Sequence, residues 1–199
     1  MREKILNIAG GKFSPILDPP KTPTFLVNVD TMYYENSDPV MVENKFGSWA
    51  GTQDETYNIN ADVFEFMERT IMNFDRVCIY RFLEHVSFTQ VAYFIYLVST
   101  VTKPGAIVDV IVPNYEALAH MILSEDANTT LKMFDFEANN ILLTTELLNE
   151  PSCPHASIWT PYRANYFWEL EGRFKLHEKW SKYTFDGRDI YLRFILKRV

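Results

Sequence analysis

A glycine turn and a carboxylate each follow a short apolar run near the start of the chain. The run at residues 5–8 is followed by Ala9, Gly10 and Gly11, and the run at residues 25–29 is followed by Asp30. Glycines let a backbone approach a ligand closely because they carry no Cβ. A carboxylate at the carboxyl end of a buried strand can accept both hydroxyls of a ribose, as in dinucleotide-binding folds. Together, the two features predict a nucleoside site at the ends of neighbouring strands.

Alternating strand and helix patterns would place these residues at one edge of a sheet. Strands are expected at residues 5–8, 25–29, 57–62, 74–83 and 106–112, and helices at 63–72, 88–102, 115–124 and 162–170. Asp186-Gly187 separates β-rich runs at 174–183 and 189–198, which is a hairpin signal. The order predicts an α/β fold with a doubly wound, mostly parallel sheet and a C-terminal antiparallel hairpin.

Two of the expected helices carry apolar side chains at helical spacing, which predicts that these side chains lie in the core. In the helix at 88–102 they are Val91, Phe94, Ile95, Val98 and Val101. In the helix at 162–170 they are Tyr162, Tyr166, Phe167 and Trp168.

The connections differ in how regular they can be. Residues 12–24 contain Pro15, Pro19, Pro20 and Pro23, and interior prolines exclude a regular helix. We therefore expect an irregular crossover between two parallel strands. With 199 residues the chain is expected to form one domain, residues 1–199, in which residues 126–161 are the least regular stretch.

Composition limits the partners and the compartment. The formal net charge of −7 argues against a general nucleic-acid binder, although a nucleic acid held by one local patch stays open. Cys78 and Cys153 make no disulfide framework, which favours a reducing compartment. No signal-peptide pattern is present, and the longest apolar run, residues 91–101, is too short for a membrane span. We therefore expect a soluble, cytoplasmic protein.

The motifs and their order resemble those of the class I S-adenosylmethionine-dependent methyltransferases, and within them a branch of short, methyltransferase type 11-like members. The matching pieces, in chain order, are Leu6-Asn7-Ile8-Ala9-Gly10-Gly11, Asn28-Val29-Asp30, Asp62, Phe82-Leu83-Glu84-His85-Val86, Lys103-Pro104-Gly105-Ala106 and Val112-Pro113-Asn114. They span residues 4–114, and the terminal hairpin fits the family's last strands. Ala9 departs from the pattern, since the family usually has its first glycine there.

The resemblance implies a Rossmann-like methyltransferase fold with S-adenosylmethionine as cofactor. The residues it implies for cofactor binding are Ala9, Gly10, Gly11, Asp30, Thr31, Met32, Asp62, Val63, Arg81, Phe82 and Glu84. The glycine turn would pass under the methionine part, Asp30 would bind the ribose, and Asp62 would accept from the adenine amine. Arg81, Phe82, Glu84 and His85 would line the cofactor and face the substrate. Residues 126–161 would form a substrate-side insertion or lid.

Several of these residues have structural roles open to them as well. Asp30 could cap the loop that follows it, and Asp62 could cap the helix. His85 and His155 are the candidate catalytic bases, because the ordinary pKa of histidine suits proton transfer near neutral pH. His85 could instead be structural, and His155 could bond to backbone carbonyls of its loop. Cys153 and His155 are too few ligands for zinc, so no metal site is expected.

The implied activity is the transfer of a methyl group to an acceptor that the sequence does not identify, either a small molecule or a protein. A catalytically silent binding protein on the same scaffold is the alternative, which Ala9 keeps open. A nicotinamide-dependent oxidoreductase is disfavoured, because the third glycine of Gly-x-Gly-x-x-Gly is absent and Pro15 blocks the helix that would bind pyrophosphate. The sequence does not indicate an oligomeric state.

Overall fold

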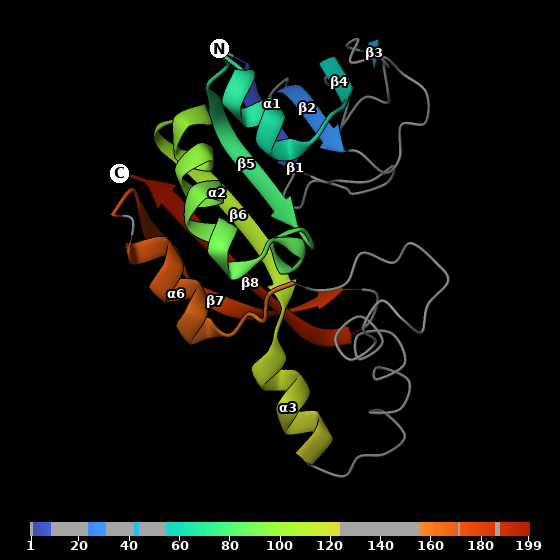
Figure 1. Cartoon of the computed structure of the whole chain (residues 1–199), viewed down its shortest axis with the longest axis vertical. Helices are drawn as coiled ribbons and strands as arrows, with labels where there is room; N and C mark the ends of the chain where they lie inside the picture. Colours follow the sequence, from blue (N-terminus) through green and yellow to red (C-terminus); the bar gives the residue numbers. More distant parts are fainter. Residues whose placement is uncertain are drawn as a thin grey trace.

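The strands of the computed structural model pair into one mixed sheet. The structure describes residues 2–8, 24–30, 42–43, 55–123, 156–170, 172–185 and 188–199. Within these residues, eight strands lie in the order β3-β4-β2-β1-β5-β6-β8-β7 (Figure 1). The strands are β1 Glu3–Ile8, β2 Thr24–Asp30, β3 Val42–Glu43, β4 Glu55–Asn60, β5 Phe74–Tyr80, β6 Thr102–Pro113, β7 Phe174–Phe185 and β8 Arg188–Arg198.

The pairing confirms the predicted doubly wound sheet. Strands β4, β2, β1, β5 and β6 pair in parallel. Strand β3 pairs antiparallel with β4, and β8 pairs antiparallel with both β6 and β7. Phe185 pairs with Arg188, which confirms the hairpin that Asp186-Gly187 predicts, although those turn residues lie outside the described part. The irregular crossover predicted for residues 12–24 also lies almost wholly outside it.

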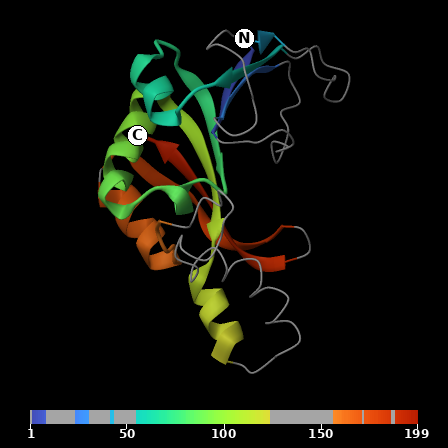
Figure 2. The same cartoon turned by 45° about the vertical axis from the view of Figure 1, so that its right-hand side comes forward.

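Three helices cover one face of the sheet. They are α1 Val63–Arg69, α2 Phe88–Val101 and α6 Pro161–Leu170, and Figure 2 shows them on the same side of the strands. Helix α3, Tyr115–Leu123, instead continues past the carboxyl end of β6. The single 3-10 turn of the described part, η1 Leu83–His85, lies between β5 and α2.

The apolar core lies between the sheet and these helices. On α2 the predicted stripe of Val91, Phe94, Ile95, Val98 and Val101 is buried, with no member more than 1% exposed. Val77, Ile79, Val108 and Val110 face it from β5 and β6 as members of the same core cluster. Each such side chain contributes about 1.5–3 kcal/mol by leaving water. The prediction for this helix is confirmed.

The prediction for the aromatic residues of α6 is wrong for two of the four. Trp168 is fully buried and packs edge-on against Phe174, with 5.2 Å between the ring centroids. Phe167 is partly buried against the core. Tyr162 and Tyr166 are 77% and 52% exposed, because α6 turns only one side toward the sheet.

Strands β4 and β5 both end earlier than the sequence predicts. Strand β5 ends at Tyr80 because the next residue, Arg81, has a φ of 56° and donates its N–H to Ile111 O at 2.8 Å. Leu83 is buried in the turn that follows, so its apolar character does not require a strand. Strand β4 ends at Asn60, and Asp62 begins a helix.

Strand β6 begins at Thr102, before the predicted residue 106, and is irregular where Gly105 interrupts it. The register with β5 shifts between Phe74 and Arg76, and Gly105 has a φ of +83°. Residues other than glycine rarely adopt this backbone conformation. A Cβ at Gly105 would meet nothing within 4 Å, so only the backbone conformation demands glycine.

Replacing Gly105 with Ala should therefore lower the free energy of unfolding by about 1–2 kcal/mol through backbone strain. Urea unfolding followed by circular dichroism measures the loss. Gly105→Asn is the matched control, because asparagine tolerates positive φ better and should lose less. Equal losses for the two variants would show that the conformation is not what requires glycine.

At the amino end of β5, Asp75 joins three segments of the chain. Its carboxylate accepts from Lys103 Nζ at 2.6 Å and from the backbone N–H of Lys4 at 2.9 Å. Partial burial alone would raise the pKa of Asp75, but the hydrogen bond from Lys103, the Lys4 N–H and the charges of both lysines outweigh it and lower the pKa below the ordinary 3.8.

Asp75→Asn should destabilise the protein near neutral pH, and the difference from the unchanged protein should shrink in acid. Because the pKa of Asp75 is lower in the folded chain, its contribution is full above 3.8 and is lost as the pH falls through 3.8 toward the folded-state pKa. Urea unfolding of both proteins from about pH 7 to about pH 3 tests this. A difference that stays constant over that range would contradict it.

Candidate functional site

The carboxyl ends of four parallel strands meet at one edge of the sheet. Strand β1 ends at Ile8, which pairs with Val29 on β2 and with Ile79 on β5. Asp30, the last residue of β2, pairs with Asn60, the last residue of β4. Ligands of open α/β sheets bind outside such ends. The segments that follow β1, β2, β4 and β5 therefore start side by side at the predicted nucleoside site.

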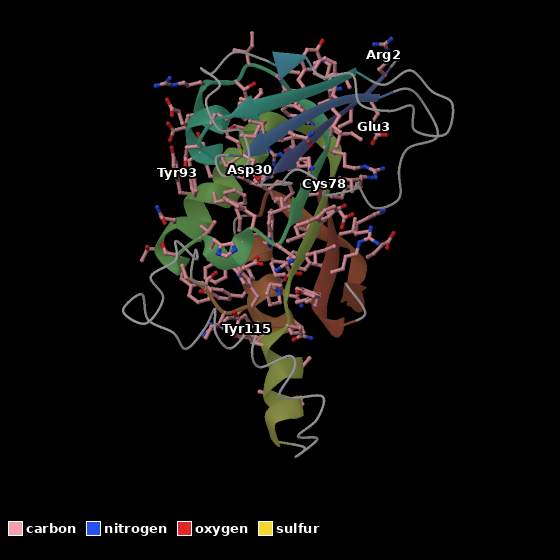
Figure 3. All side chains as sticks on the ribbon, turned by 90° about the vertical axis from the view of Figure 1, so that its right-hand side faces the viewer. Arg2, Glu3, Asp30, Cys78, Tyr93 and Tyr115 are labelled. Carbon is pink, nitrogen blue, oxygen red and sulfur yellow. The ribbon has the colours of Figure 1, made fainter. Side chains whose placement is uncertain are left out.

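Asp30 lies at this edge and is 6% exposed (Figure 3). A carboxylate buried to this extent needs hydrogen-bond donors, and Asp30 has a partner within the chain. Its position at the end of β2 is the one that the ribose prediction requires. Ala9, Gly10, Gly11, Thr31 and Met32 directly follow β1 and β2 in the sequence, but lie outside the described residues.

Asp62 is the N-cap of α1. Its Oδ1 accepts from the backbone N–H groups of Phe64 at 2.9 Å and Glu65 at 3.1 Å, so the structural role considered for it is confirmed. Both bonds end on Oδ1, and the residue is exposed. Val63 is 5% exposed and its side chain belongs to the core. Val63 can therefore offer a ligand little beyond its backbone.

The turn after β5 holds the other candidate residues. Arg81 places its guanidinium over the ring of Tyr191, 5.7 Å from the centroid. Phe82 packs against Phe94, with 5.5 Å between centroids. Glu84 is 1% exposed. His85 is half-buried, and its backbone N–H donates to Phe82 O at 2.9 Å. Glu84 and His85 lie in the 3-10 turn η1, and Arg81 and Phe82 lead into it, so none of the four is in the strand that the sequence predicts up to residue 83.

A short segment before α6 binds this turn, which the sequence did not indicate. The N–H groups of Ala156 and Ser157 donate to Glu84 O at 2.7 and 3.0 Å, and Ser157 Oγ donates to Leu83 O at 2.9 Å. Trp159 is fully buried and donates its indole N–H to Ser157 Oγ at 2.9 Å. Ala156 and Ser157, from the predicted insertion or lid, are thus bonded to the turn after β5. His155 and the preceding residues of that insertion lie outside the described part.

A partly buried amide pair lies close to this edge. Asn7 on β1 donates Nδ2 to Asn28 Oδ1 on β2 at 3.0 Å. Asn7 is 2% exposed, and its Oδ1 has no hydrogen-bond partner among the described residues. Leaving a buried acceptor unsatisfied costs about 1–3 kcal/mol. The sequence signal was an asparagine inside each of two otherwise apolar runs, and the pair is a further polar group beside the predicted site.

No three His, Cys, Asp or Glu side chains in the described part of the chain are grouped so that they could hold a metal ion. None of the described helices has both the length and the apolar composition needed to cross a membrane.

Solved structures of S-adenosylmethionine-dependent methyltransferases share this fold. One from Methanosarcina mazei matches with a TM-score of 0.60 and 16% identity, over 100% of this chain and 93% of that chain. The N-methyltransferase NodS from Bradyrhizobium japonicum, in complex with S-adenosyl-L-homocysteine, matches with a TM-score of 0.54 and 13% identity, over 98% of this chain and 78% of its own. The complex of DhpI with S-adenosylhomocysteine also has a TM-score of 0.54 and 13% identity, over 99% and 77%.

No protein-family model matches the sequence, and no curated protein matches it either. At 13% to 16% identity, the likeness to these solved structures shows the fold of this chain alone. The fold is that of the class I methyltransferases, as the sequence motifs implied.

Replacing Asp62 separates its capping role from its predicted binding role. Asp62→Ala should lower the free energy of unfolding by about 1 kcal/mol, because two N–H groups of α1 lose their acceptor. Asp62→Ser should retain most of that stability, since serine caps helices as well as aspartate does. If the carboxylate binds the adenine amine, both variants should bind S-adenosylhomocysteine more weakly in calorimetry. Unchanged affinity in Asp62→Ser would show that Asp62 is only a cap.

Proposed function

We propose that this chain, which has the fold of the class I S-adenosylmethionine-dependent methyltransferases, binds that cofactor and transfers its methyl group to an acceptor. The observation that carries the proposal is the position of Asp30. It is a nearly buried carboxylate at the end of β2, paired in register with the last residue of β4 and next to the end of β1. Within this fold, a carboxylate at that position suits the paired hydroxyls of a ribose.

The described residues offer hydrogen-bond acceptors that suit the donor groups of the cofactor. Asp30 would bind the ribose, and Asp62 has an oxygen left for the adenine amine after capping α1. Asn7 Oδ1 is a buried acceptor on β1, two residues before Ala9 in the sequence. By the sequence motif, Ala9, Gly10 and Gly11 would lie under the methionine part. When bound, S-adenosylmethionine supplies a methyl carbon activated by a sulfonium.

The chain's own contribution would be mainly to orient the reacting groups, because a displacement at an activated carbon gains most from alignment. The turn at Leu83–His85 is well suited to this role, since the segment from Ala156 to Trp159 fixes its carbonyls. His85 and His155 are the proposed proton acceptors, needed only where the acceptor must lose a proton.

We propose a small molecule or a protein as the acceptor. The net charge of −7 gives no support for binding nucleic acid in general. We also propose a reducing, cytoplasmic compartment. Cys78 is a free thiol, and the two cysteines of the sequence make no disulfide framework.

A catalytically silent binding protein on the same scaffold is the competing proposal. It is favoured by Ala9, because a methyl group stands where the family's first glycine gives the backbone its closest approach to the cofactor. The two proposals differ in whether the folded chain binds S-adenosylhomocysteine at all.

Thermal unfolding with and without ligand tests the proposal. A ligand that binds only the native state at about 100 times its Kd adds about 2.7 kcal/mol of stability. S-adenosylhomocysteine should raise the melting temperature, and NAD should not. Asp30→Ala should abolish the shift while circular dichroism shows that the variant is folded.

The control for this experiment is Asp75→Asn, which removes a carboxylate from the opposite edge of the same sheet and should keep the full shift. A shift that persists in Asp30→Ala would show that the ribose assignment is wrong. No shift with either ligand in the unchanged protein would favour the silent scaffold.

A further inference from the structure

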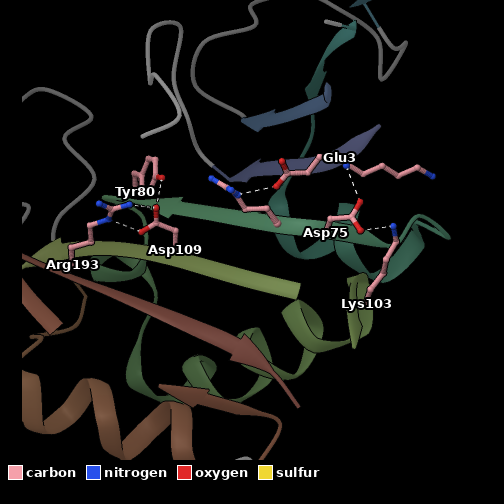
Figure 4. A network of polar contacts seen from close by, with 8 residues as sticks. Glu3, Asp75, Tyr80, Lys103, Asp109 and Arg193 are labelled. Atoms are coloured by element: carbon pink, nitrogen blue, oxygen red, sulfur yellow. Dashed lines mark hydrogen bonds and ion pairs between the residues drawn. The ribbon is translucent and has the colours of Figure 1, made fainter. Parts of the chain in front are cut away.

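A buried polar cluster joins three strands on the sheet face opposite the helices. Asp109 on β6 is 2% exposed and accepts from Arg193 on β8 through Nε at 2.9 Å and Nη2 at 2.8 Å. Tyr80 on β5 donates its hydroxyl to the same carboxylate at 2.8 Å. Figure 4 shows the three side chains converging. The Asp109 carboxylate therefore binds β5 to the C-terminal hairpin across β6.

The cluster lies near the carboxyl edge, next to the candidate site. Tyr80 is the last residue of β5 and pairs with Ile111, which pairs in turn with Arg193. Asp109 alternates along β6 with Val108 and Val110, which belong to the core under the helices, so it faces the other way. The residue after Tyr80 begins the turn that carries Phe82, Glu84 and His85.

The first residue of that turn, Arg81, is held by β6 and β8, two of the strands that the cluster joins. Arg81 has a φ of 56°, which is unusual for a residue other than glycine. Such a conformation persists only where its surroundings fix it. Here β6 accepts its N–H at Ile111 O, 2.8 Å away, and β8 places the Tyr191 ring under its guanidinium. The cluster therefore fixes Tyr80, and the hydrogen bond and the ring contact fix the next residue, Arg81.

The presence of a buried ion pair does not by itself indicate a gain in net stability. Buried ion pairs are often no more stabilising than apolar side chains of the same volume, because desolvation offsets their attraction. What the bidentate pair adds is a fixed direction for the tyrosine hydroxyl, since the arginine fork locks the carboxylate in one orientation.

We propose that Tyr80, Asp109 and Arg193 are positioning residues for the cofactor site. They fix the end of β5 against the C-terminal hairpin, and thereby set the geometry of the turn from Arg81 to His85. This inference rests on the proposed function for its consequence in ligand binding. Its structural part, the ordering of the turn, can be measured without any ligand.

The test replaces the cluster with apolar residues of similar volume, as Tyr80→Phe, Asp109→Leu and Arg193→Met together. Amide hydrogen exchange measured by NMR reports on the turn, because the N–H groups of Arg81, His85 and Val86 are each hydrogen-bonded. These amides should exchange about tenfold faster relative to those of α2, and calorimetry should show about tenfold weaker binding of S-adenosylhomocysteine.

The matched control removes the ion pair that joins β5 and β6 at their other ends. Lys103 Nζ lies 2.6 Å from Asp75 Oδ1, joining β6 to β5 at their amino ends (Figure 4). Asp75→Asn with Lys103→Gln should lower the melting temperature without changing the exchange of the turn relative to α2. Its affinity for S-adenosylhomocysteine should equal that of the unchanged protein.

Two outcomes overturn the inference. One is that, in the triple variant, the amides of the turn and those of α2 speed up by the same factor. The other is that the control variant changes the exchange of the turn as much as the triple variant does. If the unchanged protein binds no S-adenosylhomocysteine, the proposed function fails, and hydrogen exchange alone decides whether the cluster orders the turn. If the triple variant does not fold, Tyr80→Phe takes its place. This substitution removes one hydroxyl and keeps the ion pair, and should shift both readouts in the same direction by a smaller factor.

Discussion

The parallel pairing of β1 with β2 on one side and β5 on the other is the constraint on which the candidate site depends. Because parallel strands present their carboxyl ends at the same edge, the segments after Ile8, Asp30 and Tyr80 start together. No attraction between the site's own side chains is needed to assemble it. The apolar residues of these strands hold the register, since a slip of one residue would exchange Leu6 with Asn7 between the two faces.

Patterns that local physics controls were readable from the sequence. The stripe on α2 and the Asp186-Gly187 hairpin were predicted correctly, because helical spacing and turn chemistry depend only on near neighbours. The end of β5 was not predicted. Leu83 is as apolar and as buried as a strand residue, and periodicity cannot distinguish a buried strand from a buried turn. The positive φ of Arg81, which ends the strand, leaves no mark in composition.

The candidate site was only partly predictable, for a related reason. Asp30 and Asp62 stand at the ends of strand patterns, so the sequence predicts that both lie near the carboxyl edge of the sheet, and their binding roles stay predictions. The contacts that shape the turn join residues far apart in the chain. Ser157 and Leu83 are separated by 74 positions, and Arg193 and Asp109 by 84. A serine or an arginine within its own segment does not identify a partner at such distance, so only the folded sheet shows these pairs.

The two faces of the sheet differ in a way that the proline content of the first crossover helps to explain. The face under α1, α2 and α6 is apolar. The opposite face carries the Asn7–Asn28 pair and the Asp109 cluster among apolar residues such as Ile5. In a doubly wound sheet, a helix after the first strand normally covers that face and requires it to be apolar. The prolines at residues 15–23 argue against such a helix. A face that need not match a helix can hold polar side chains that bond to one another, and here they join the C-terminal hairpin to the edge where the predicted cofactor residues begin.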